Sequence, residues 1–173
     1  MIRYVALHQV PHDAVEALLD HAFGADRHRR TAYAIRGEGL VGGRAIDALG
    51  FAALDGDRLV GTIQCWPIAL IADDRAHPLV MIGPVAVEPD QQQHGIGREL
   101  MRHALDAAAA QGLDDRLMLI GDPEYYGRFF GCTAERTGAW QAPGPVERHR
   151  LLARGDAVPD GAGMLGPRIA APV

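Results

Sequence analysis

The chain has 173 residues, of which 48% are hydrophobic and 23% are charged, and its formal net charge is −5. This length predicts one domain with its own core, and the acidic balance argues against a nucleic-acid-binding protein, which normally carries a basic stripe. Its two cysteines, Cys65 and Cys132, are spaced too widely for a disulfide scaffold or a cysteine zinc site.

Hydrophobic periodicity and turn residues predict a mixed α/β chain. Two stretches of apolar residues at helical spacing end at Gly24 and at Gly112. Asp55-Gly56-Asp57 indicates a hairpin turn. The basic residues Arg27, Arg29 and Arg30 are typical of a solvated face. In chain order, the expected elements are a strand at 2–7, a helix from Pro11, a polar helix or mobile loop at 25–39, strands at 49–55, 58–70 and 79–87, a helix at 95–111, a strand at 117–120, a helix from Pro123 to about Phe130, and strands near 134–140 and 148–154.

No segment approaches the roughly 18 uninterrupted apolar residues of a membrane span. The apolar stretch at the N-terminus is too short for a signal peptide. We therefore expect a cytoplasmic protein with no membrane partner. His8 and His12 are four residues apart but straddle Pro11, so they cannot share a helix face, and no other histidine pair has this spacing on a helix; no metal is therefore expected.

The apolar strand at 79–87 is interrupted by Gly83-Pro84. Proline cannot donate to a strand ladder and glycine weakens it, so this pair predicts a bulge where pairing with a neighbouring strand is lost. A kinked or edge strand is the simpler alternative. The amides freed by such a bulge need a polar partner.

A second irregularity, Gln92-Gln93-His94-Gly95-Ile96-Gly97, lies between that strand and an amphipathic helix. The first N–H groups of a helix lack internal partners and lie at the positive end of its dipole, so such a turn can bind phosphate. A plain strand-to-helix turn is the alternative. A dinucleotide fingerprint would need a third glycine where Leu100 stands.

Gln92-x-x-Gly95-x-Gly97, after Val85-Ala-Val-Glu-Pro-Asp90, resembles the acetyl-CoA pyrophosphate motif of the GNAT acetyltransferase superfamily. Gly121-Asp-Pro-Glu-Tyr-Tyr-Gly-Arg-Phe129, Leu59-Val-Gly-Thr-Ile63 and Pro145-Val-Glu-Arg-His-Arg-Leu-Leu152 are similar to its YhbS-like branch. The resemblance implies a mixed α/β (α+β) fold, with a twisted, mostly antiparallel sheet that has a bulged central strand and is flanked by helices. It covers one acyltransferase domain at 1–155, followed by an irregular Gly/Pro-rich tail at 156–173.

The resemblance also implies an N-acetyltransferase that moves an acetyl group from acetyl-CoA to a primary amine by direct attack in a ternary complex. Strand amides would hold the pantetheine arm and thioester carbonyl, the next turn would hold the pyrophosphate, and an amide freed by the bulge would stabilise the oxyanion. Tyr126 would protonate the departing thiolate. The implied cofactor-binding residues are Val85, Ala86, Val87, Gln92, Gln93, His94, Gly95, Ile96, Gly97 and Arg98.

The general base and the acceptor are left open by the sequence. An alkylammonium is neutral at pH 7 only about once in 10^3.4, a cost of roughly 4–5 kcal/mol. Glu88 is the carboxylate nearest the cofactor strand, although its position beside Pro89 is typical of a solvated turn. The acceptor is expected to be a small-molecule or peptide amine, and a homodimer is possible because dimers are common in the family.

One departure from the family pattern concerns the acceptor pocket. The branch reads Arg-Phe-Gly-Phe, whereas Arg128-Phe-Phe-Gly-Cys132 is one residue longer, which puts the following strand's register in question. A CoA-binding regulatory module without turnover therefore stays open as an alternative function. An acyltransferase that uses a longer acyl donor is a second, separate alternative.

Overall fold

The computed structural model describes residues 1–37 and 44–168. The expected order of helices and strands is found as far as the helix that begins at Pro123, and the differences lie in the C-terminal part; the predictions for 38–39 and 169–173 lie outside the described residues. Helices and strands follow in the order β1 (Ile2–Ala6), α1 (His12–Phe23), α2 (Thr31–Arg36), β2 (Phe51–Asp55), β3 (Arg58–Ala72), β4 (Arg75–Val87), α3 (Ile96–Ala110), β5 (Leu117–Ile120), α4 (Pro123–Phe130), β6 (Trp140–Gln141), β7 (Leu151–Arg154) and β8 (Gly163–Pro167).

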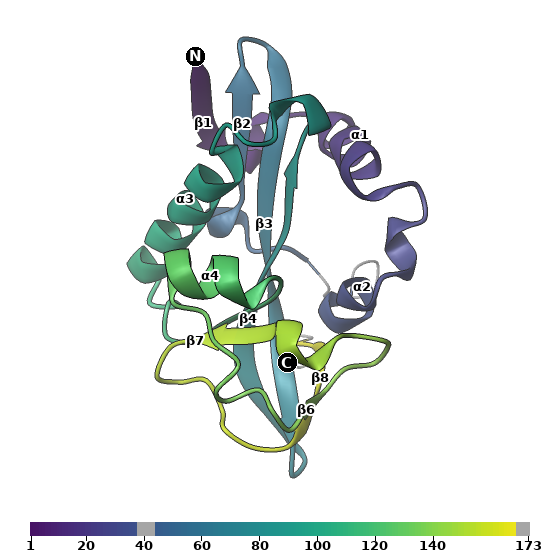
Figure 1. The fold of residues 1–173 in the computed structure, drawn as a ribbon, viewed down its shortest axis with the longest axis vertical. Helices are drawn as coiled ribbons and strands as arrows, with labels where there is room; N and C mark the ends of the chain where they lie inside the picture. Colours follow the sequence, from purple (N-terminus) through teal and green to yellow (C-terminus); the bar gives the residue numbers. More distant parts are fainter. Residues whose placement is uncertain (38–43, 169–173) are drawn as a thin grey trace, which may run out of the picture. The chain divides into compact units, whose positions relative to one another are not determined.

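The eight strands form one sheet in the order β1-β2-β3-β4-β5-β7, with β8 paired to β3 and to β6 (Figure 1). Among the registered pairs, β4–β5 and β6–β8 are parallel, and the others are antiparallel. This confirms the predicted mixed α/β fold with a mostly antiparallel sheet. The chain forms two compact units, one of Met1–Arg29, Ala45–Cys65 and Ile82–Gln111, the other of Arg30–Arg44, Trp66–Met81 and Gly112–Val173.

In the first unit, α1 and α3 cover opposite faces of the strands (Figure 1). Ala86 of β4 packs in a buried cluster with Val15, Leu18 and Leu19 of α1. On the other side of β4, a Cβ on Gly97 of α3 would lie 3.8 Å from Cγ2 of Val87 and 3.9 Å from Cγ1 of Val85, the two residues next to Ala86. Successive strand residues point to opposite faces, so the two helices enclose β4 between them.

Gly61 lets α3 approach β3 closely. A Cβ there would lie 2.9 Å from Cγ2 of Ile96 and 3.1 Å from Cδ1 of Leu100, both in the first turns of α3. We expect Gly61→Ala to lower the free energy of unfolding by about 1–3 kcal/mol, because the helix must shift. Urea denaturation measures this. A Cβ on Gly161 meets nothing within 4 Å, so Gly161→Ala is the control and should change little.

In the second unit, β5 lies between β4 and β7. Its pairs with β4 are Val80–Leu117 and Met81–Met118, and it pairs with β7 along its whole length. The strand predicted at 117–120 and the helix predicted from Pro123 are found at the same bounds.

The predictions for the C-terminal part were partly wrong. Gly163–Pro167, expected to be irregular, forms β8, and a Cβ on Gly163 would lie 2.7 Å from Cγ of Leu70, so glycine permits this close pairing. The strand expected at 134–140 is reduced to β6 and a single bridge, Thr133–Ala153. In this stretch the buried Thr137 hydroxyl donates to the Leu151 carbonyl at 2.7 Å, a side-chain bond that competes with strand pairing.

The prediction of a solvated basic face was wrong for Arg27, which is only 2% exposed. Its guanidinium contacts Glu16 and donates from Nε to Oδ1 of Asp20 at 2.9 Å. These two carboxylates lie four residues apart on α1 and so share one helix face. A buried cation requires carboxylate partners of this kind, and the two carboxylates on α1 therefore account for the burial of Arg27.

Candidate functional site

The candidate cofactor strand is the end of β4, where the chain leaves its pairing with β5. In the described residues this pairing ends at Met81, two residues before Gly83-Pro84. Gly83 has a φ of 132°, outside the strand range, and its peptide bond to Pro84 is cis. The loss of pairing and the backbone of Gly83 agree with the irregularity predicted at this point of the strand.

The turn from β4 to α3 has an unusual backbone. Gln93 and Gly95 have φ values of 78° and 77°, in the left-handed region. Gly95 is the N-cap of α3, no side-chain hydrogen bond caps the helix, and a Cβ on Gly95 would meet nothing within 4 Å. A helix start has the positive end of the helix dipole, which favours an anion there.

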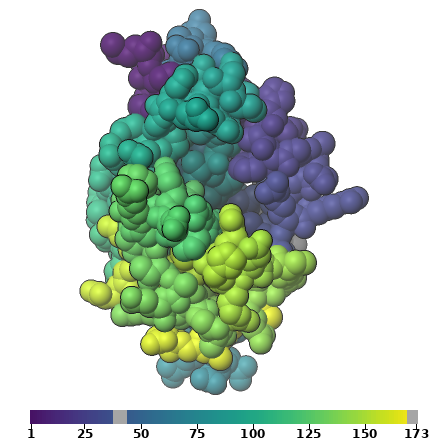
Figure 2. Space-filling view, viewed as in Figure 1, coloured from purple at the N-terminus to yellow at the C-terminus, as the bar shows by residue number. Residues whose placement is uncertain are grey.

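The side chains of this turn are exposed, and those with described contacts reach back to the turn itself. Gln92 donates to the Val87 carbonyl at 3.4 Å, and Nδ1 of His94 lies 3.4 Å from Oε1 of Gln91. Ile96 is buried and anchors the first turn in the core. The turn forms part of the teal surface near the top of Figure 2.

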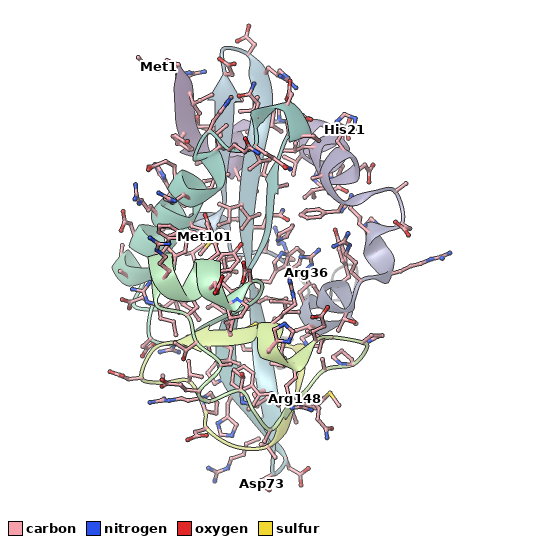
Figure 3. All side chains as sticks on the ribbon, viewed as in Figure 1. Met1, His21, Arg36, Asp73, Met101 and Arg148 are labelled. Atoms are coloured by element: carbon pink, nitrogen blue, oxygen red, sulfur yellow. The ribbon has the colours of Figure 1, made fainter. Side chains whose placement is uncertain are left out.

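Glu88 is not the solvated turn residue that its sequence position suggested. Its side chain is 14% exposed, and its Oε1 lies 3.3 Å from Nδ1 of His21. His21 lies on α1 and is labelled in Figure 3. The Glu88 amide donates to the Val60 carbonyl at 2.8 Å. This carboxylate is therefore engaged with α1, and the structure assigns no general base.

Tyr126 lies in the first half of α4, which begins as the sequence predicted. Asp122 caps the helix by accepting from the Glu124 amide at 3.0 Å, and Pro123 follows at the first helical position. A Cβ on Gly121 would lie 2.4 Å from Cε2 of Tyr126, so only glycine leaves room for this ring position. The Tyr125 ring meets it edge-on at 4.9 Å.

Burial raises the pKa of the Tyr126 phenol above its usual value, and the neighbouring Tyr125 and Cys132 act in the same direction. Arg150 opposes them with a smaller effect. The phenol is therefore held in its protonated form at neutral and mildly alkaline pH. Burial also raises the thiol pKa of Cys132 to about 11 and of Cys65 to about 12, so neither is a thiolate nucleophile at neutral pH.

The extra residue in Phe129-Phe130-Gly131-Cys132 is accommodated where α4 ends. The helix extends to Phe130, and Gly131 caps it with a left-handed φ of 69°. The Cys132 amide donates to the Tyr126 carbonyl at 3.1 Å. The start of α4, which carries Tyr126, is thus unaffected, as the sequence predicted.

The sequence model of the acetyltransferase (GNAT) family matches residues 12–129. The chain belongs to this family. No curated protein matches the sequence significantly. Solved structures of GNAT proteins share the fold at low sequence identity. Escherichia coli YhbS, a GNAT family N-acetyltransferase in complex with CoA, superposes with a TM-score of 0.66 at 23% identity, covering 95% of this chain and 87% of YhbS.

Two further GNAT structures have the same fold. A GNAT family acetyltransferase from Brucella melitensis in complex with acetyl-CoA has a TM-score of 0.57 at 24% identity, covering 91% of this chain and 97% of that one. The ribosomal-protein-S18-alanine N-acetyltransferase of Escherichia coli has a TM-score of 0.52 at 19% identity, covering 88% and 90%.

Within residues 1–37 and 44–168, no group of three or more His, Cys, Asp and Glu side chains is placed to hold a metal ion. Across the same part of the chain, no helix has the length and apolar character of a membrane span.

Proposed function

We propose that this GNAT protein is an N-acetyltransferase that uses acetyl-CoA and transfers the acetyl group to a primary amine of a small molecule or peptide. The observation that supports it most is the left-handed Gly95 at the start of α3, because this 15-residue helix begins on a glycine with no side-chain hydrogen bond to cap it. A pyrophosphate is the ligand that such a helix end favours. The crystallised relatives hold CoA or acetyl-CoA.

In this proposal the backbone binds the cofactor. Amides of Val85 and Val87 pair with the pantetheine arm and the thioester carbonyl, with Ala86 between them. Amides from Gln93 to Arg98, with Gln92 at the start of the turn, hold the pyrophosphate. A strand amide near the Gly83-Pro84 irregularity stabilises the oxyanion that forms when the amine attacks.

Tyr126 is proposed as the general acid. When the amine attacks the thioester carbonyl, the carbon–sulfur bond breaks and the sulfur leaves as a thiolate. The Tyr126 phenol donates its proton to that sulfur, and its raised pKa keeps the proton on the phenol until this step. The amine nitrogen loses one proton to solvent as the amide forms, and the Tyr126 phenolate regains a proton from solvent, so the protons balance. The amine attacks directly, with no acyl-cysteine intermediate, since both thiols are buried and protonated.

Calorimetry and a turnover assay test this proposal together. Acetyl-CoA is titrated into the protein beside its 3′-dephospho analogue, and CoA thiol release is then followed with a panel of primary amines and of acyl donors. Saturable acetyl-CoA binding with amine-dependent thiol release supports the proposal. Binding without turnover on any donor indicates a CoA-binding module, and turnover only with longer acyl-CoAs indicates a different donor. Absence of binding would refute the cofactor assignment.

We expect kcat/KM to rise with increasing pH and to show no descending limb below about pH 10. The free-amine fraction of the acceptor grows about tenfold per pH unit below its pKa near 10.4, so kcat/KM rises with it. A general acid causes a descending limb only above its own pKa, and burial raises that of Tyr126 beyond its usual value. Initial rates from pH 6.5 to 10.5 measure the profile. A descending limb centred near pH 8 would contradict this role.

A further inference from the structure

The turn ahead of α3 is tied to β3 by an ion pair with two hydrogen bonds. Arg58, the first residue of β3, donates from Nη1 to Oδ2 of Asp90 and from Nη2 to Oδ1, both at 3.0 Å. Asp90 lies in the 3₁₀ turn Pro89–Gln91 that follows β4. Such paired geometry fixes orientation as well as distance, which a single contact does not.

A backbone bond joins the same two segments beside this pair. The Glu88 amide donates to the Val60 carbonyl at 2.8 Å, and the Gln91 amide closes the 3₁₀ turn on the Glu88 carbonyl, also at 2.8 Å. The entry to the turn is thus attached to β3 at two points, Val60 and Arg58. The next residues of the turn have no such described bond to β3, since the side-chain contacts of Gln92 and His94, both at 3.4 Å, are made to Val87 and Gln91.

We propose that Arg58 is a positioning residue for acetyl-CoA: by holding Asp90 it fixes the turn that presents the Gln93–Arg98 amides. This inference rests on the function proposed above. A turn held in its bound conformation before the ligand arrives costs less to order on binding, so the ion pair raises affinity without touching the ligand. Both Nη atoms of Arg58 already donate to Asp90, which favours positioning over direct contact with phosphate.

A charge-swap series tests the proposal. Arg58→Ala and Asp90→Asn are each expected to raise the acetyl-CoA Kd and KM by about threefold to tenfold, with kcat unchanged. The double variant Arg58→Asp/Asp90→Arg restores the pair in reverse and should return Kd to within about twofold of the original protein. Arg102→Ala removes another exposed ion pair, to Glu99 on α3, and should leave Kd unchanged.

The outcomes separate positioning from the alternatives. A loss of affinity in Arg58→Ala but not in Asp90→Asn would show that Arg58 binds the anionic ligand itself, and would overturn the proposal. So would a swapped variant as weak as the single variants.

Amide hydrogen exchange without ligand gives a second test that does not depend on acetyl-CoA. The segment 88–95 should exchange faster in Arg58→Ala and Asp90→Asn than in Arg102→Ala, and equal rates would overturn the proposal. If the unmodified protein binds no acetyl-CoA, the proposed function fails, and this exchange experiment still decides whether Arg58 holds the turn.

Discussion

Gly95→Asp is expected to weaken acetyl-CoA binding by about 100-fold or more. The residue stands at the N-cap of α3 with a φ of 77°, where a side chain projects into open space beside the first-turn amides. A carboxylate there would occupy the place proposed for the pyrophosphate and repel it, since like charges close together cost several kcal/mol where water is partly excluded. Calorimetric titration of acetyl-CoA measures the loss.

Gly112→Asp is the matched control for this prediction. Gly112 follows the other end of α3 with a φ of 70°, and a Cβ there also meets nothing within 4 Å. Aspartate therefore causes similar backbone strain in both variants, and only the position of the charge differs. Gly95→Ala adds the strain without the charge and should cost only a few-fold in affinity. Equal losses in the two aspartate variants would show that strain, not the anion site, explains the effect.

Much of the fold was predictable because its signals are local. The bounds of α4 follow from Asp122, Pro123 and Gly131, which act within one or two turns of the helix. The hairpin between β2 and β3 follows from Gly56, whose φ is 61°. The turn before α3 was predictable for the same reason, because the signal for it, Gly95, lies at the turn itself.

The features that sequence analysis missed depend on residues far apart in the chain. β8 pairs with β3 across more than 90 residues, so its glycine and proline content alone suggested an irregular tail. Arg58 and Asp90 are 32 positions apart, and no local pattern in the sequence pairs them. The contact between Glu88 and His21 of α1 likewise joins residues 67 positions apart. For Arg27, the carboxylate pair four residues apart on α1 was a usable signal.

Tyr126→Phe is expected to lower kcat by about 100-fold or more, with the KM for acetyl-CoA nearly unchanged. The substitution removes the hydroxyl that would protonate the thiolate and keeps the ring that packs edge-on to Tyr125, so the fold should be retained. Steady-state kinetics with a fixed amine measure both constants. A variant that turns over as fast as the original protein would remove Tyr126 from the mechanism and favour direct departure of the thiolate.

Gly121→Ala tests whether the position of that hydroxyl matters. Its new Cβ would lie 2.4 Å from Cε2 of Tyr126, so the ring must move and kcat should fall, whereas Gly138→Ala, with nothing within 4 Å, should not change it. If Gly121 acts through the hydroxyl alone, adding Gly121→Ala to Tyr126→Phe lowers kcat no further, because the group to be positioned is already absent. Multiplied losses in the double variant would instead mean that Gly121 shapes the site independently of Tyr126.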